Sequence, residues 1–237
     1  MNSKLIEQIT ETLIAEIKTG RIDIDQMLPS ERELSIRFKT SRPSIREALT
    51  ELQKRGYVKL TPNHRPRADL PSVEKIINLS MIQIRDLLGK SETASYLEQL
   101  RQFIELGALR TVIEKSSTIK LSEIYRSLLG CYEAIGDLKK FIAADIKFHQ
   151  SIVAVVENPI LISIHNQLLQ ANLLKRKGMN DQKDHDLMVY EEHSEIYKAV
   201  HDANLDNAVK VMERHLSRSF KSSLIIYLGG NNSHPHT

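Results

Sequence analysis

The stretch PSERELSIRFKTSRPSIREALTEL, residues 29–52, decides the fold of the first part of the chain. Ser30 and Glu33 have the spacing of a capping box, in which each side chain accepts a hydrogen bond from the other residue's backbone N–H. The box predicts a short helix over 30–38. A three-residue turn follows, and the next apolar stripe predicts a second helix over 42–55. Two helices joined by a tight turn are therefore expected.

The segments on either side complete a small domain. Apolar residues at three- and four-residue steps predict a helix over 4–18. Alternating residues predict one short strand over 57–60 and another over 67–69, joined by a turn. Three helices followed by a small hairpin make a winged helix-turn-helix domain, which we expect to span residues 1–70.

The net charge is concentrated in this domain. The chain has 237 residues, with 33 Lys and Arg against 30 Asp and Glu, and a formal net charge of +3. Residues 1–70 hold 13 of the basic and 10 of the acidic residues, so they carry the whole excess. Between 32 and 67 ten basic residues stand against three acidic ones. This pattern favours a polyanion such as double-stranded DNA as partner, and a solvated charged surface is the alternative.

Six side chains are candidate DNA contacts. They are Arg32, Arg42, Ser44, Arg46, His64 and Arg65. The three on the second helix of the motif are expected opposite its core stripe, near the end that reaches base edges in the major groove. Arg32, on the first helix of the motif, is placed to contact a phosphate. His64 and Arg65, at the hairpin tip, are placed to lie along the minor groove. The alternative is that Arg42 and Arg46 pair with Glu47 or Glu51 on the surface.

From residue 71 onward the pattern is helical throughout. Helices are predicted over 71–88, 93–115, 119–135, 137–156, 158–177, 186–202 and 205–226. Six or seven such helices form an antiparallel all-α bundle, so the chain is mainly α. We expect 71–90 to be a linker and first bundle helix, 91–228 to be the bundle, and 229–237 to be a mobile tail.

Several classes of protein are excluded by composition. A single cysteine, Cys131, excludes a disulfide framework and a CxxC metal knuckle. No stretch approaches the ~18 uninterrupted apolar residues of a membrane helix. The first residues carry acids within their apolar pattern, unlike a signal peptide. The sequence therefore predicts a cytoplasmic protein.

Four polar residues fall on apolar stripes of the predicted bundle. Asp145 and His149 are four apart on one helix, and His193 and His215 lie on two later helices. Burying an acid and three imidazoles without partners is costly. A divalent cation bound by three imidazole nitrogens and one carboxylate oxygen would satisfy all four. The alternative is that each histidine makes its own hydrogen bond.

The motifs PSEREL at 29–34, SRPSIREAL at 41–49 and GYV at 56–58 closely resemble bacterial GntR-type transcriptional regulators. The resemblance implies that Arg32, Arg42, Ser44, Arg46 and His64 contact DNA. The hairpin differs from many relatives because it has Pro62 and Pro66 and no glycine.

The bundle resembles the metal-binding ligand domain of the FadR-type branch of that family. The resemblance rests on DIKFH at 145–149, Glu192-His193 and MERHL at 212–216. It implies that Asp145, His149, His193 and His215 bind a divalent metal ion, with zinc favoured and nickel, manganese or iron as alternatives. An effector would bind beside this metal.

The same resemblance places Arg101 near the pocket, where its guanidinium would clamp an effector carboxylate. Asn166 and Arg110 are weaker candidates for the pocket. The alternative for Arg101 is a salt bridge to Glu98 or Glu105.

The stretches LPSVEKII at 70–77 and YLEQLRQFIE at 96–105 look most like the sialic-acid-responsive repressors of this branch. We therefore expect a homodimeric repressor of a sugar-acid or organic-acid operon, controlled by a small carboxylate such as sialic acid, and not an enzyme. The alternative is a metal-dependent hydrolase or lyase with Glu192 as general base, although Glu192 is expected on the outer face of its helix. The sequence contains no GxSxG, HExxH or glycine-rich phosphate loop that would favour that alternative.

Overall fold

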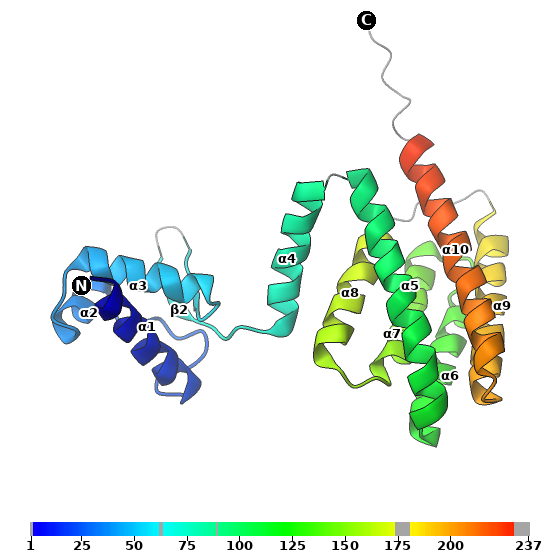
Figure 1. The fold of residues 1–237 in the computed structure, drawn as a ribbon, viewed down its shortest axis with the longest axis horizontal. Helices are drawn as coiled ribbons and strands as arrows, with labels where there is room; N and C mark the ends of the chain where they lie inside the picture. Colours follow the sequence, from blue (N-terminus) through cyan, green and yellow to red (C-terminus); the bar gives the residue numbers. More distant parts are fainter. Residues whose placement is uncertain (1, 62–63, 89, 174–180, 230–237) are drawn as a thin grey trace, which may run out of the picture. The chain divides into compact units, whose positions relative to one another are not determined.

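The computed structural model describes residues 2–61, 64–88, 90–173 and 181–229. The chain divides into two compact units, Met1–Ile76 and Ile77–Thr237. Helices make up more than half of the first unit and most of the second, and the described part of the first unit adds two short strands (Figure 1). The expected mainly α fold is confirmed.

Three helices form the first unit. They are α1 (Asn2–Lys18), α2 (Glu31–Arg37) and α3 (Arg42–Lys54). Leu13, Leu34 and Leu52, one from each helix, are completely buried in a single apolar cluster. Around the cluster, ion pairs join Arg37 to Glu16 and Arg55 to Glu11, so α1 is tied to the segments that follow it.

Two serine caps fix where α2 and α3 begin. The predicted capping box is present: Ser30 Oγ accepts from the Glu33 amide at 3.2 Å, and Glu33 Oε2 accepts from the Ser30 amide at 2.6 Å. At the start of α3, Ser41 Oγ accepts from the Ser44 amide at 3.4 Å. Side-chain oxygens thus satisfy amides that have no partner within their own helix.

The hairpin is smaller than the sequence predicted. It consists of β1 (Val58–Lys59) and β2 (Arg67–Ala68), antiparallel, with Val58 opposite Ala68. Met27, which lies before α2, forms a further bridge with Arg67 that the sequence did not indicate. The neighbouring Leu28 amide donates to the Pro66 carbonyl at 2.8 Å. The segment before α2 therefore holds the hairpin against the helices.

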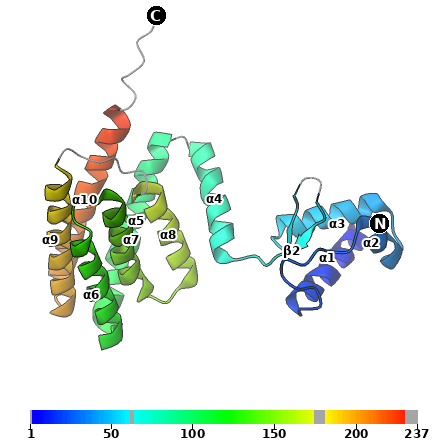
Figure 2. The ribbon, with the colours of Figure 1, turned by 180° about the vertical axis from the view of Figure 1, so that it is seen from behind.

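Helices make up the second unit throughout its described part. They are α4 (Val73–Leu88, which begins in the first unit), α5 (Lys90–Lys115), α6 (Thr118–Glu133), α7 (Leu138–Ala154), α8 (Pro159–Leu173), α9 (Gln182–His201) and α10 (Leu205–Gly229). In both views α6 lies beside α7 and α9 lies beside α10 (Figures 1 and 2). Short connections join each of these pairs, as expected for antiparallel neighbours in a bundle. On the other side of the unit, Met81 of α4 packs in a small cluster with Leu97 and Leu168.

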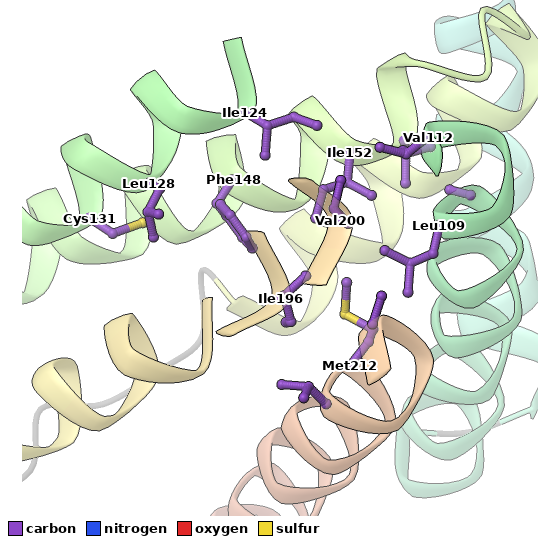
Figure 3. Packing of buried hydrophobic residues seen from close by; sticks show 14 of the residues in the cluster. Leu109, Val112, Ile124, Leu128, Cys131, Phe148, Ile152, Ile196, Val200 and Met212 are labelled. Carbon is purple, nitrogen blue, oxygen red and sulfur yellow. The ribbon is translucent and has the colours of Figure 1, made fainter. Parts of the chain in front are cut away.

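The main core of the second unit lies where α5, α6, α7, α9 and α10 meet. Figure 3 shows the side chains of Val112, Phe148, Ile152, Val200 and Met212 gathered in one shared interior. All five are almost completely buried. This interior positions the site described next, because residues adjacent to these on α7, α9 and α10 carry its polar groups.

Some predicted boundaries move and some lie beyond what the structure describes. α9 begins at Gln182, four residues before the predicted 186, and α10 continues to Gly229. Gly89, which follows the helix predicted over 71–88, and residues 230–237 of the expected mobile tail fall outside the described residues, whereas Gly229 is the last residue of α10. Within the described part of the chain, no helix has the length and apolar character needed to cross a membrane.

Candidate metal centre and nucleic-acid surface

Four side chains with metal-ligating groups converge inside the second unit. Asp145 and His149 come from α7, one helical turn apart and so on one face. His193 comes from α9 and His215 from α10. All four are buried, and one ligand atom from each lies within 4.8 Å of the others. The structure thus brings together the four residues that the sequence singled out.

The ring Nε2 atoms face a common centre. His149 Nε2 lies 3.3 Å and His193 Nε2 lies 3.4 Å from the same oxygen, Asp145 Oδ1. His215 Nε2 is 3.2 Å from His149 Nε2 and 3.4 Å from His193 Nε2. Four-coordinate zinc with bonds of about 2.0–2.1 Å keeps its ligand atoms roughly 3.3–3.4 Å apart. The spacing of these atoms therefore fits one small cation.

Buried carboxylates hold the far side of two of these rings. His149 Nδ1 donates to Glu105 Oε2 at 2.6 Å, and His215 Nδ1 donates to Glu192 Oε2 at 2.7 Å. With the proton on Nδ1, each Nε2 presents its lone pair to the centre, as in carboxylate–histidine–metal arrangements. Two lone pairs facing each other repel unless a proton or a cation lies between them. These residues therefore fit a divalent cation.

The third imidazole is held by stacking. The His193 ring lies against Phe148, with ring centroids 4.1 Å apart and an angle of 17° between the planes. Its Nδ1 has no hydrogen-bond partner among the described residues. An aromatic face thus takes the orienting part that a carboxylate plays for the other two rings.

The surroundings shift the pKa values of the three rings in different directions. Burial lowers the pKa of His193 well below its usual value, and lowers the pKa of His215 to about 4 despite its bond to Glu192. Burial also opposes charge on His149, but Glu105 outweighs it, so the pKa of His149 is raised. Without a metal, His149 is therefore the ring of the three that most readily takes up a second proton, while burial favours the neutral, metal-binding form of the other two.

Glu105 connects the candidate metal ligands to a second buried group. Arg101 Nε donates to Glu105 Oε1 at 2.6 Å, and His165 Nε2 donates to the same oxygen at 2.9 Å. Arg101 is only 1% exposed and lies 3.7 Å from Glu98 as well. The salt bridge weighed as an alternative for Arg101 thus exists. Even so, Nη1 and Nη2 of Arg101 have no hydrogen-bond partner within the described part of the chain.

The sequence reasoning missed three residues of this site. Glu105 and His165 are completely buried and were not chosen. Glu192 was expected on an outer face, which is wrong: it is 8% exposed and binds His215 and Arg218. The sequence does indicate that these residues are buried, because each of the three falls on the apolar stripe of its own helix. Glu192, for example, lies between Val189 and Ile196.

The remaining pocket candidates lie elsewhere. Asn166 is half-buried, and its Oδ1 accepts from Gln150 Nε2 at 2.9 Å. It therefore faces α7 at Gln150, whereas the neighbouring His165 faces Glu105. Arg110, a weaker candidate for the pocket, is exposed.

The exposed side of α2 and α3 carries three of the predicted DNA contacts. Arg32 and Arg42 are exposed and form no ion pair with any described residue. Arg46 is also exposed, and its Nε donates to both oxygens of Glu31 at 2.9 and 3.0 Å. This pairing differs from the alternative considered from the sequence, in which Arg46 binds Glu47 or Glu51.

The expectation that Ser44 shares this exposed side is wrong. Its side chain is only 4% exposed, and its Oγ lies 3.0 Å from the Oγ of Ser41. Ser44 lies one turn before Ala48 on the buried stripe of α3, so it points inward. Its structural part is to support the start of α3.

The two hairpin candidates differ from each other. Arg65 Nη2 donates to the Leu28 carbonyl at 2.7 Å and lies 3.6 Å from Glu33, so Arg65 is held against the start of α2. His64 is exposed, and its described contact is a backbone bond from its amide to the Thr61 carbonyl at 3.0 Å. The side chain of His64 is therefore accessible to a partner.

Comparisons with known proteins cover both units. The family model for bacterial regulatory proteins of the gntR family matches residues 5–66, and the FCD domain model matches residues 97–218. The chain is 31% identical over 219 residues to the HTH-type transcriptional repressor NanR of Cronobacter sakazakii, covering 92% of this chain and 84% of that protein. It is 31% identical over 224 residues to NanR of Edwardsiella tarda, covering 94% and 86%.

Solved structures show the same fold. A GntR protein of Streptococcus agalactiae aligns with a TM-score of 0.58 at 22% identity, over 92% of this chain and 99% of that one. McbR/YncC of E. coli aligns with a TM-score of 0.51 at 16% identity, over 94% of this chain and 98% of that one. At these identities the similarity extends to the fold alone.

Proposed function

Since this chain belongs to the gntR family of bacterial regulatory proteins and carries an FCD domain, we propose that a small carboxylate bound beside the buried metal centre controls its affinity for operator DNA. Like its named relatives, the chain is a transcriptional repressor, and it is not an enzyme. The metal, the effector, the homodimer and the cytoplasmic location are the parts that we propose.

The observation that carries the proposal is the buried Arg101. Its guanidinium is 1% exposed and uses Nε for Glu105, while Nη1 and Nη2 make no hydrogen bond to any described residue. Two parallel N–H donors in a dry interior match a carboxylate, which they can bind through two charge-assisted hydrogen bonds. A small anionic effector is therefore the ligand that this group fits.

The metal centre supports the same assignment. Asp145, His149, His193 and His215 would hold the ion, and the ion would add positive charge next to the effector site. Zinc is favoured because three imidazoles and one carboxylate at these spacings suit a four-coordinate ion, and nickel, manganese or iron are alternatives. Glu105 contacts His149 on one side and Arg101 on the other, so occupancy of either site would affect the other.

DNA binding is assigned to the exposed cations of the first unit. Arg42 and Arg46 would reach bases from α3, Arg32 would bind a phosphate, and His64 and Arg65 would lie along the minor groove. We propose a homodimer, because two such units read two half-sites, whereas one unit has a small footprint. Effector binding would then change the affinity by favouring one of two arrangements of the dimer.

Sialic acid is the first effector to test. We expect N-acetylneuraminate to change the affinity of the metal-loaded protein for promoter DNA adjacent to its own gene, measured by electrophoretic mobility shift and fluorescence anisotropy. Arg101→Ala should lose this response and keep the affinity of the free protein for DNA. If no sugar acid or other organic acid alters DNA binding by the wild-type protein, the effector proposal is wrong.

A hydrolase or lyase at the same metal site is not supported. The residue required as general base, Glu192, is bound to His215 and to Arg218, and these bonds lower its pKa to about 2 against the opposing effect of burial. A carboxylate held in this way is a weak base, and it supports a metal ligand instead of a substrate.

A further inference from the structure

His165 is a buried histidine with one unused ring nitrogen. It lies on α8 and is completely buried, and its Nε2 donates to Glu105 Oε1 at 2.9 Å. Its Nδ1 has no hydrogen-bond partner among the residues that the structure describes. A buried polar atom without a partner costs roughly 1–3 kcal/mol, so such atoms mark places where another molecule completes the contact.

The contact with Glu105 decides what kind of partner the free nitrogen needs. A carboxylate only accepts, so the proton of the neutral ring must be on Nε2. Burial lowers the pKa of His165 and outweighs the opposing effect of Glu105, which keeps the ring neutral. Nδ1 therefore carries a lone pair and can only accept a hydrogen bond.

Arg101 offers the complementary chemistry close by. Its Nε and the His165 Nε2 bind the same oxygen of Glu105, at 2.6 and 2.9 Å. The two side chains therefore meet at one buried carboxylate oxygen. Nη1 and Nη2 of Arg101 are donors and Nδ1 of His165 is an acceptor, and none of the three is hydrogen-bonded within the described residues.

We propose that His165 determines effector specificity, because its Nδ1 accepts a hydrogen bond from a hydroxyl or amide N–H of an effector whose carboxylate is bound by Arg101. The site then selects hydroxy acids, including sugar acids, over carboxylates of the same size that lack a donor. A ligand without the donor leaves the buried acceptor unpaired, which is why discrimination results. This inference rests on the proposed effector role of Arg101.

Two substitutions separate the two nitrogens of His165. In His165→Gln the side-chain amide can still donate to Glu105 from the Nε2 position, but no acceptor remains at the Nδ1 position. In His165→Asn the amide oxygen can occupy the Nδ1 position, but the donor to Glu105 is lost. Metal content and melting temperature of both full-length variants are measured first, to compare their folding with the wild type.

The probes are matched pairs of acids tested by isothermal titration calorimetry on the metal-loaded full-length protein. Lactate is compared with propionate and malate with succinate, and N-acetylneuraminate serves as the largest hydroxy acid. We expect the wild type to favour the hydroxylated member by about five- to tenfold, the effect of one hydrogen bond. His165→Gln should bind both members equally and weaken N-acetylneuraminate binding by a similar factor, whereas His165→Asn should keep the preference.

The outcomes distinguish this inference from the function on which it rests. Equal binding of both members of every pair by the wild type would overturn the role of His165 and leave the carboxylate site intact. A preference that persists in His165→Gln would also overturn it, because the hydroxyl would then be read elsewhere, for example by the metal. Failure of the wild type to bind any of these acids would overturn the effector proposal itself.

Discussion

At the scale of single residues, Arg46 illustrates how a neighbour prepares a side chain for a partner. Glu31 holds its Nε from α2, and the side chain of Arg46 is 66% exposed. Fixing Nε orients the guanidinium and leaves Nη1 and Nη2 available to pair with guanine O6 and N7. Arg46 is therefore the exposed cation of α3 whose orientation the structure defines.

Arg46→Ala should weaken binding to the specific operator by roughly 1–3 kcal/mol, with a smaller effect on unrelated DNA. Fluorescence anisotropy with both DNAs at one salt concentration checks this. Arg126→Ala is the matched control, since Arg126 is an exposed cation on α6 of the other unit. Equal losses on both DNAs would assign Arg46 to phosphate contact, and no loss would remove it from the interface.

The raised pKa of His149 should make metal binding depend on pH. Because its pKa is raised, His149 keeps its second ring proton up to a higher pH than an ordinary histidine does. A metal ion must displace that proton. His215, with a pKa lowered to about 4, is already neutral at pH 6. Apparent metal affinity should therefore rise with pH until His149 deprotonates and then level off.

Metal binding measured with a chelator competitor between pH 6 and 8.5, together with proton release in weak buffer, tests this prediction. About one proton should be released per metal ion below the pKa of His149, and none well above it. His149→Ala should bind metal far more weakly. A flat affinity across this range, without proton release, would contradict the assignment of His149.

The sequence indicated the four residues that converge on the proposed metal centre but not the residues that support them. The four ligands stood out because polar groups on apolar stripes need a partner. Glu105, His165 and Glu192 stand on similar stripes, yet their roles depend on which helices become neighbours, and periodicity does not specify this. The prediction for Ser44 was wrong for a local reason, because Ser44 lies one turn before Ala48 and therefore on the buried stripe of α3.

At the scale of elements, the position of α2 depends on its capping box. The helix has only seven residues, so its own propagation contributes little, and Ser30 and Glu33 satisfy two of its end amides. This is why residues 29–34 predicted the element accurately from sequence. The hairpin was predicted less well, because its pairing with Met27 is a contact between segments far apart in the chain.

Ser30→Ala should destabilise α2 by about 1 kcal/mol, the usual effect of removing a side-chain cap. Hydrogen exchange of the α2 amides, followed by mass spectrometry, should then be roughly fivefold faster, with α10 unchanged. Ser30→Asp keeps an acceptor at the cap and is the matched control. Unchanged exchange in Ser30→Ala would mean that packing of Leu34 alone holds the helix.

At the scale of the whole molecule, the two units derive stability from different sources. The first unit has its own apolar cluster and serine caps. The second has a larger core together with the four converging ligands on α7, α9 and α10. His149 and His215 are 66 positions apart, so a shared ion would close a long loop of chain. The metal should therefore stabilise only the second unit.

Removal of metal with a chelator should lower the melting temperature of the second unit while leaving that of the first unchanged. An ion present at 1,000 times its Kd adds about 4 kcal/mol, or roughly 8–16 °C for a unit of this size. Differential scanning calorimetry resolves the two transitions, and near-ultraviolet circular dichroism assigns them, because four tyrosines pair across α6 and α9 (Tyr125 with Tyr197, Tyr132 with Tyr190). His215→Ala should melt at the lower temperature already and be insensitive to chelator. If the chelator leaves the second transition of a metal-containing wild type in place, the four residues do not hold that ion.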